Sequence, residues 1–201
     1  MAALVRVGLS GRVATVTMDR PEVHNAFNAE LITELTAALA RVGADPEVRA
    51  VVLAAEGKSF SAGADLNWMR AMAGFGEAEN HADALKLADL MRTLAYLPKP
   101  TIARVQGSAF GGGVGLIACC DIAITTPHVR FGLTESKLGL VPAVISPYVV
   151  AAIGARQAKR WFQSGAMFDA QHAFHMGLVH EVAPDGGLDE LVAHELDALL
   201  K

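Results

Sequence analysis

The sequence predicts an α/β fold with largely parallel strand pairing, because strand-like and helix-like segments alternate along the chain. Short apolar runs rich in valine, isoleucine and alanine are followed by segments in which leucines recur at helical spacing. Glycine-rich turns separate several of these runs from the next helix. No internal repeat or linker interrupts the pattern, so residues 1–201 are expected to form a single domain.

The elements follow from local patterns. Residues 4–9 and 12–18 alternate apolar and polar side chains on either side of a turn, which indicates a hairpin. Asn28 is placed to cap the first helix, and Asp65 the second. The expected strands are residues 4–9, 12–18, 48–54, 101–105, 122–125, 131–132 and 179–182. The expected helices are residues 29–42, 78–96, 146–153, 155–162, 170–176 and 188–200, a segment after residue 65 and one ending at residue 120.

Composition and charge exclude several classes of protein. Hydrophobic residues make up 52% of the chain and charged residues 19%, which is typical of a globular protein and not of a disordered one. The net charge of −4 and the lack of a cluster of lysine and arginine argue against nucleic-acid binding.

The chain lacks the signals of membrane insertion, secretion and metal binding. Arg6 and Arg12 interrupt the apolar segment that a signal peptide needs, and no apolar run reaches the length of a membrane span. The only cysteines, Cys119 and Cys120, are adjacent and provide no disulfide framework. No spacing of metal ligands stands out. A cytoplasmic protein without a membrane partner, a metal or an organic cofactor is therefore expected.

Two glycine-containing loops are the strongest candidates for a ligand site. Residues 60–66 and 107–113 each follow an expected strand and lead into an expected helix. Small residues allow close approach of a ligand, and the free amides of a helix N-terminus favour an anion or a developing oxyanion. Neither loop has the pattern of a dinucleotide-binding turn or of a phosphate loop, so a nucleotide-binding interpretation is weak.

Five motifs in these and neighbouring segments resemble the enoyl-CoA hydratase/isomerase, or crotonase, superfamily. In order they are DRPEVHNAFN (19–28), SAGADL (61–66), GGG (111–113), CDIA (120–123) and FGLTE (131–135). The resemblance extends from the first hairpin to about Val182. It implies a spiral of ββα units with a C-terminal helical region that is incomplete in this chain, and assembly as a homotrimer or a dimer of trimers.

The resemblance also assigns roles. The backbone amides of Ala62 and Gly112 would form an oxyanion hole for a thioester carbonyl, and Glu135 aligns with one of two catalytic glutamates of the hydratases. Coenzyme A would enter only as part of an acyl-CoA substrate. The candidate contacts of the coenzyme A and acyl groups are Val23, His24, Ala62, Ala64, Asp65, Leu66, Gly111, Gly112, Gly115 and Leu140.

One position departs from the family pattern. The first glutamate of the two-glutamate hydratases is replaced by Gly115, which cannot move a proton. Two kinds of enzyme remain open: a hydratase in which Glu135 works through an ordered water or with the help of another group, and an isomerase that needs one acid/base group. A non-catalytic acyl-CoA-binding or scaffold protein also remains open. Residues 61–69, 111–116 and 138–149 resemble bacterial methylglutaconyl-CoA hydratases and the related geranyl-pathway hydratases, which also lack the first glutamate. A branched substrate such as 3-methylglutaconyl-CoA is therefore expected, with Gly115 making room for its branch.

Overall fold

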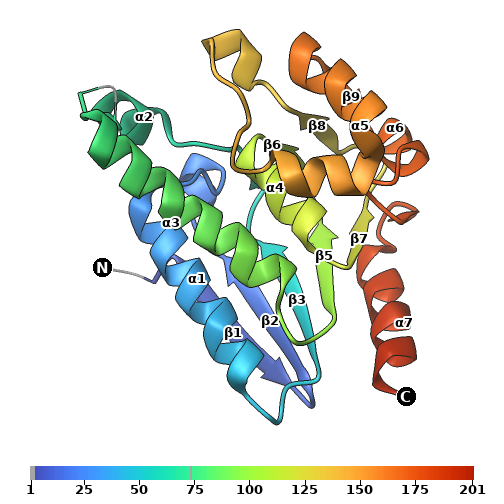
Figure 1. Cartoon of the computed structure of the whole chain (residues 1–201). Helices are drawn as coiled ribbons and strands as arrows, with labels where there is room; N and C mark the ends of the chain where they lie inside the picture. Colours follow the sequence, from blue (N-terminus) through green and yellow to red (C-terminus); the bar gives the residue numbers. More distant parts are fainter. Residues whose placement is uncertain (1–2, 73) are drawn as a thin grey trace.

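The computed structural model describes residues 3–72 and 74–201, which form two sheets and the helices around them (Figure 1). The larger sheet has the order β1 (Val5–Ser10), β2 (Val13–Met18), β3 (Ala50–Ala55), β5 (Thr101–Val105), β7 (Ile122–Thr125) and β10 (Glu181–Val182). The smaller sheet has the order β4 (Ser59–Ser61), β6 (Ser108–Phe110), β8 (Arg130–Gly132) and β9 (Met167–Asp169). Pairing is antiparallel between β1 and β2 and between β8 and β9, and parallel elsewhere.

From β3 to β8, successive strands alternate between the two sheets. Each of the pairs β3–β4, β5–β6 and β7–β8 places its first strand in the larger sheet and its second in the smaller one, and helices follow each pair. These helices are α2 (Leu66–Met72) and α3 (Glu77–Ala95), then α4 (Gly112–Cys119), then the short turn η2 (Glu135–Leu138) with α5 (Ser146–Ser164). The arrangement is a spiral of ββα units, as expected.

Helices cover both faces of the larger sheet. Helices α1 (Ala29–Ala44) and α3 pack against each other over one face, and α7 (Leu188–Leu200) contacts β3, β5 and β7 from the other (Figure 1). Every residue of β3 is buried, as expected of a parallel strand with helices on both sides. The remaining elements are the short turn η1 (Pro21–Val23) and α6 (Ala170–His175).

Most of the expected elements are confirmed, including the hairpin and the long helices. Asn28 caps α1 by accepting a hydrogen bond from the Leu31 amide at 2.8 Å. Three strands were missed, namely β4, β6 and β9. Each has three residues and lies next to a glycine or a loop, so its periodicity is too short to read from the sequence.

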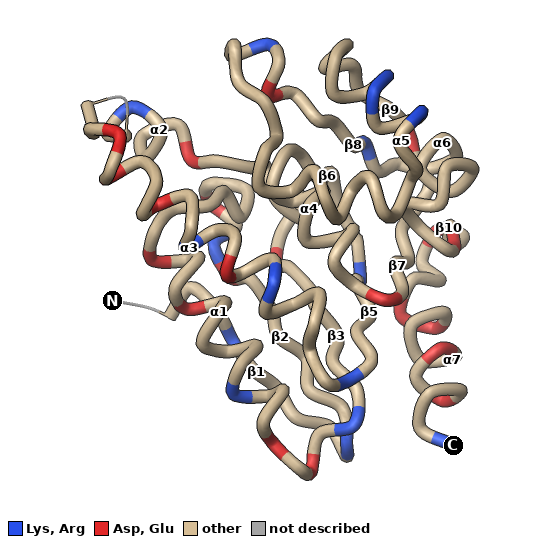
Figure 2. Tube along the Cα trace, in the orientation of Figure 1, with Lys and Arg blue, Asp and Glu red and all other residues tan. Residues whose placement is uncertain are grey.

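Charged residues of both signs are distributed along the described chain (Figure 2). None of the helices in residues 3–72 and 74–201 is long and apolar enough to cross a bilayer. Within the same ranges, no three His, Cys, Asp or Glu side chains gather as a metal site would require.

Candidate active site

A cleft of about 490 Å³ lies where the two glycine-containing loops meet helices α2 and α3 and the segment that follows η2. Its wall is mainly apolar and includes Phe27, Trp68, Leu87 and Ile145. Such a concave, apolar cavity with a few polar groups is the usual form of a small-molecule site. The cleft is therefore the candidate active site.

Glu135 supplies a carboxyl group to this cleft. Its Oε2 atom is buried and has no hydrogen-bond partner in the described structure. Burial raises the pKa of the Glu135 carboxyl above the usual value of glutamate. This carboxyl group keeps its proton to a higher pH than an ordinary glutamate does, and one of its oxygens has no hydrogen-bond partner. Such a group is suited to exchange a proton with a ligand.

The first glycine of the triple places this carboxyl close to the start of α4. A Cβ atom built on Gly111 would lie 3.1 Å from Glu135 Oε1. The next residue, Gly112, begins α4, and its amide has no acceptor among the described residues. An added Cβ on Gly112 would lie 2.6 Å from the ring of Phe27, so only glycine fits there without movement. Gly112, whose amide is free, therefore lines the cleft together with Glu135.

The second free amide belongs to Ala64 and not to Ala62. The Ala62 amide donates a hydrogen bond of 2.9 Å to the carbonyl of His24, which contradicts its expected role in an oxyanion hole. On either side of Ala64, Gly63 O and Asp65 N pair with the backbone of Phe27, while the Ala64 amide has no acceptor in the described chain. Ala64 lines the cleft, so the candidate oxyanion-hole donor is its amide, two residues after the expected one of Ala62.

A buried hydrogen-bond network holds this loop in place. Asn25 has no exposed surface, and its side-chain amide donates to the carbonyls of Glu56 and Ser59 at 2.8 and 2.9 Å. Its Oδ1 accepts from the amide of Arg20, and its own carbonyl accepts from the hydroxyl of Ser61 at 2.9 Å. The DRPEVHNAFN motif therefore positions the SAGADL loop.

The same motif supplies a partner for Asp65. Its Oδ1 accepts from the amides of Asn67 and Trp68 at the start of α2, which confirms its expected role as a helix cap. Its Oδ2 pairs with the Arg20 guanidinium at 3.1 Å, and neither side chain is much exposed. Backbone and Arg20 hydrogen bonds outweigh burial and lower the pKa of Asp65, although burial is the largest single effect. Asp65 is therefore held as an ionised structural group and does not line the cleft.

The other candidate contacts divide into two groups. Leu66, Gly111 and Leu140 line the cleft. Val23 and His24 lie outside its lining; His24 is exposed, and its Nδ1 is 3.1 Å from the hydroxyl of Ser59. Their contact with coenzyme A stays a prediction.

Gly115 does not enlarge the cleft. A Cβ atom at this position would lie 2.3 Å from Cγ2 of Ile145 and 3.3 Å from Cε of Met91, so neighbouring side chains already fill the space. Ile145 lines the cleft, whereas Gly115 does not. The expectation that Gly115 makes room for a branched chain is therefore wrong, because Ile145 occupies that room.

This packing predicts the cost of adding a methyl group. Gly115→Ala is expected to lower the free energy of unfolding by about 1–3 kcal/mol, because the new Cβ overlaps Ile145. In the Gly115→Ala/Ile145→Ala double variant, the total loss is expected to be smaller than the sum of the two single losses, because the overlap disappears. Urea unfolding of the four proteins measures this coupling. Additive losses would show that the two positions do not compete for one space.

Sequence reasoning missed two polar side chains in the cleft wall, besides several apolar ones. Asp83 and Thr134 line the cleft and were not candidates, although Asp83 lies on a helix face that otherwise carries leucines. For Trp68 and Met69, both an acyl pocket and simple packing were considered, with packing preferred. Both side chains line the cleft, and Trp68 also packs against the core.

Known proteins are similar to this chain in sequence and fold. The sequence profile described as Enoyl-CoA hydratase/isomerase matches residues 8–201. A Rhizobium meliloti protein named "Probable enoyl-CoA hydratase" is 39% identical over 189 residues, which cover 92% of this chain and 70% of that protein. The crystal structure of an enoyl-CoA hydratase from Shewanella pealeana is 46% identical with a TM-score of 0.95, over 98% of this chain and 74% of that one. The structure of Pseudomonas aeruginosa AtuE is 34% identical with a TM-score of 0.94, over 98% of this chain and 76% of that one. The chain thus belongs to the enoyl-CoA hydratase/isomerase family.

Proposed function

We propose that this protein catalyses the reversible addition of water to a 2-enoyl-CoA thioester. The observation that carries the proposal is the juxtaposition of one unpartnered carboxyl, on Glu135, with two free backbone amides, on Ala64 and Gly112, in a single apolar cleft. The family assignment supports an enzyme of the enoyl-CoA hydratase type, a hydro-lyase.

The two amides act on the thioester oxygen. When water attacks C3 of the enoyl group, the π electrons move through C2 and C1 and leave negative charge on that oxygen. The amides of Ala64 and Gly112 are held by the fold before reaction, so they stabilise this enolate without reorganising. Loss of one such donor typically costs about 3–4 kcal/mol of activation free energy.

Glu135 completes the reaction by moving the proton. The protonated carboxyl donates its proton to C2 as the enolate collapses, and the proton released by the attacking water restores the carboxyl. The raised pKa of Glu135 increases the fraction of protein that holds this proton at a given pH. Coenzyme A enters as part of the substrate, with the backbone near Ala62, Ala64 and Leu66 as its proposed contacts.

The position of Gly115 favours a second candidate function. Helix α4 offers no carboxyl at this position, and Ile145 fills the adjacent space. One acid/base group is enough for an isomerase that carries a proton from C2 to C4 and so converts a 3-enoyl-CoA into a 2-enoyl-CoA.

For the acyl group, the resemblance to methylglutaconyl-CoA hydratases indicates a branched chain. The apolar wall formed by residues such as Trp68, Met69 and Leu87 supports binding of a hydrocarbon. The terminal carboxylate of 3-methylglutaconyl-CoA is a separate requirement, because a buried carboxylate needs a cation or several hydrogen-bond donors.

Assays of purified protein with crotonyl-CoA, 3-methylcrotonyl-CoA, 3-methylglutaconyl-CoA and a 3-enoyl-CoA distinguish these functions. Loss of the absorbance of the conjugated thioester is the expected result for a hydratase. Appearance of that absorbance from the 3-enoyl substrate alone would identify the isomerase. Binding of acyl-CoA without turnover of any substrate would contradict both enzymatic proposals.

A further inference from the structure

The cleft wall carries two carboxyl groups and no basic side chain. Asp83 in α3 and Glu135 in η2 both line the cavity, and among the described residues no Lys, Arg or His does. Most of the remaining lining is apolar, and the hydroxyl of Thr134 is neutral. Charges act over longer distances in such poorly solvated surroundings than they do in water. The ionisable side chains of the described cleft lining are therefore carboxyl groups alone, so any fixed side-chain charge there is negative.

Asp83 is buried and only weakly paired. The residue is 7% exposed, and its Oδ2 atom is inaccessible to solvent and has no hydrogen-bond partner. Its Oδ1 atom lies 3.7 Å from Nζ of Lys86, whose side chain is 58% exposed. An ion pair with such an exposed partner contributes little, and solvent screens it. Lys86 therefore leaves most of the charge of the Asp83 carboxylate unbalanced, at a residue that lines the cleft.

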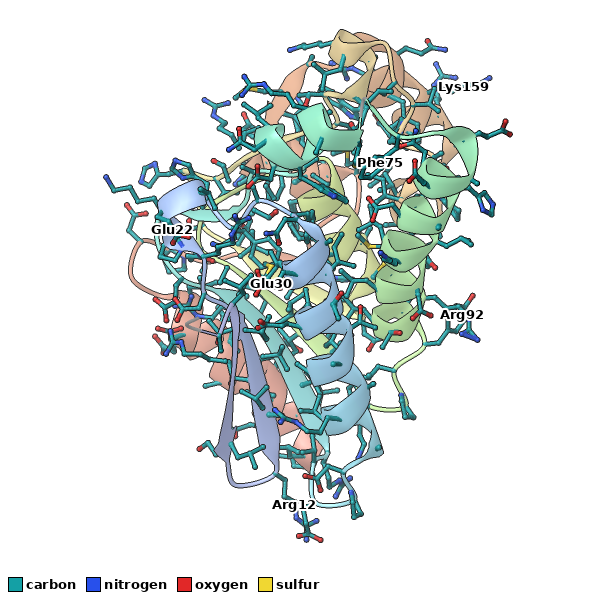
Figure 3. The ribbon with its side chains drawn as sticks, turned by 90° about the vertical axis from the view of Figure 1, so that its left-hand side faces the viewer. Arg12, Glu22, Glu30, Phe75, Arg92 and Lys159 are labelled. Carbon is teal, nitrogen blue, oxygen red and sulfur yellow. The ribbon has the colours of Figure 1, made fainter. Side chains whose placement is uncertain are left out.

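Helix α3 fixes where this charge lies. Asp83 precedes Leu87, Leu90 and Leu94 by four, seven and eleven residues, so it belongs to the inward stripe of the helix. Acidic residues continue along this helix (Figure 2). Arg92 lies toward the opposite end from the α2–α3 junction, where Phe75 is labelled (Figure 3). Nine residues of helix separate Arg92 from Asp83, or about 13 Å, which is too far for direct pairing.

We propose that Asp83 makes the cleft selective for acyl-CoA thioesters with an uncharged acyl chain and excludes chains that end in a carboxylate. The proposal rests on the proposed function, which places an acyl-CoA in this cleft. A hydrocarbon chain would contact Trp68, Met69 and Met72, which are apolar. A terminal carboxylate would lose its water next to a like charge and gain no cation. The proposal therefore disfavours 3-methylglutaconyl-CoA and favours an uncharged 2-enoyl chain.

Two saturated thioesters test this selectivity without requiring turnover. Pentanoyl-CoA and glutaryl-CoA have acyl chains of equal carbon number and differ by a terminal methyl group and a terminal carboxylate. Isothermal titration calorimetry with the wild-type protein is expected to give a Kd for pentanoyl-CoA at least about tenfold lower than for glutaryl-CoA. The selectivity is the Kd for glutaryl-CoA divided by the Kd for pentanoyl-CoA. In Asp83→Asn this ratio is expected to fall by about tenfold, because glutaryl-CoA binds more tightly than it does to the wild-type protein. Asp89→Asn, an exposed position on the same helix, is the matched control and should keep the wild-type ratio.

Several results would overturn the proposal. One is a wild-type protein that binds glutaryl-CoA as tightly as pentanoyl-CoA. Another is an Asp83→Asn protein with the same ratio of the two Kd values as the wild type. A third is an Asp89→Asn protein in which this ratio falls as much as in Asp83→Asn. The comparison of the two thioesters on the wild-type protein needs no variant, so it tests the proposed selectivity even if Asp83→Asn does not fold. Failure of the proposed function is a separate result: the protein would bind both thioesters with the expected selectivity and yet hydrate no enoyl-CoA.

Discussion

Glu135→Gln is expected to lower kcat for enoyl-CoA hydration by about 10³-fold, within the range that positioned proton transfer contributes to catalysis. The amide keeps the size of the carboxyl and fits the same space beside Gly111, but it cannot carry a proton between water and C2. KM is expected to change little, because the amides of Ala64 and Gly112 remain free. Steady-state assays with the best substrate measure both constants.

A matched control separates this effect from a general effect of charge. Glu30 is exposed on α1, lies outside the cleft lining and is labelled in Figure 3. Glu30→Gln is expected to keep wild-type kcat. A Glu135→Gln protein that retains more than a tenth of wild-type kcat would show that another group carries the proton.

The same substitution has a second expected consequence, on stability as a function of pH. Burial raises the pKa of Glu135 in the folded protein, whereas an unfolded chain has an ordinary glutamate. Between the ordinary and the raised value, the folded state binds more protons than the unfolded one, so stability falls as the pH rises through this window. Glutamine does not titrate, so Glu135→Gln avoids this loss. Its free energy of unfolding relative to wild type should increase across the window and level off above it, as urea unfolding at a series of pH values would show.

Sequence reasoning pointed to the loops of the candidate site because their motifs are short and continuous. The triple glycine and the SAGADL loop supply backbone amides, and Glu135 lies within a motif of its own. Choosing between Ala62 and Ala64 required the fold, since the choice depends on which amide pairs with the residues of η1 and its following turn. Hydrogen bonding of a single loop amide leaves no signature in the sequence.

The residues that sequence reasoning missed lie where separate elements meet. Ile145 reaches Gly115 across the boundary between α5 and α4, and no local pattern relates these two positions. Asp83 did have a signal, because a charged residue on the leucine stripe of an amphipathic helix is unusual in a packed interface. The central strands β3, β5 and β7 of the larger sheet were predictable for the opposite reason: buried parallel strands need continuous apolar runs, whatever their neighbours are.

Asn25→Ala is expected to lower the free energy of unfolding by about 3 kcal/mol or more, because the fully buried Asn25 side chain makes three hydrogen bonds to the backbone. The change removes the hydrogen-bond partner of the Glu56 carbonyl and of the Arg20 amide, all at part-buried positions. It also removes one of the two donors to the Ser59 carbonyl, which keeps a hydrogen bond of 3.3 Å from the side chain of Gln106. Asn25 also has a positive φ of 52°, a region that asparagine tolerates better than alanine. Urea unfolding measures the loss, and Asn67→Ala, at an exposed position in α2, is the control.

Asn25→Asp separates the hydrogen bonds from the shape of the side chain. Aspartate keeps an acceptor for Arg20, but it replaces the donor to Glu56 and Ser59 with an oxygen that faces both carbonyls. The loss is therefore expected to match or exceed that of Asn25→Ala, because repulsion adds to the missing bonds. An Asn25→Asp protein as stable as wild type would mean that these bonds do not hold the loop. The position of the Ala64 amide would then depend on the Phe27 pairing alone.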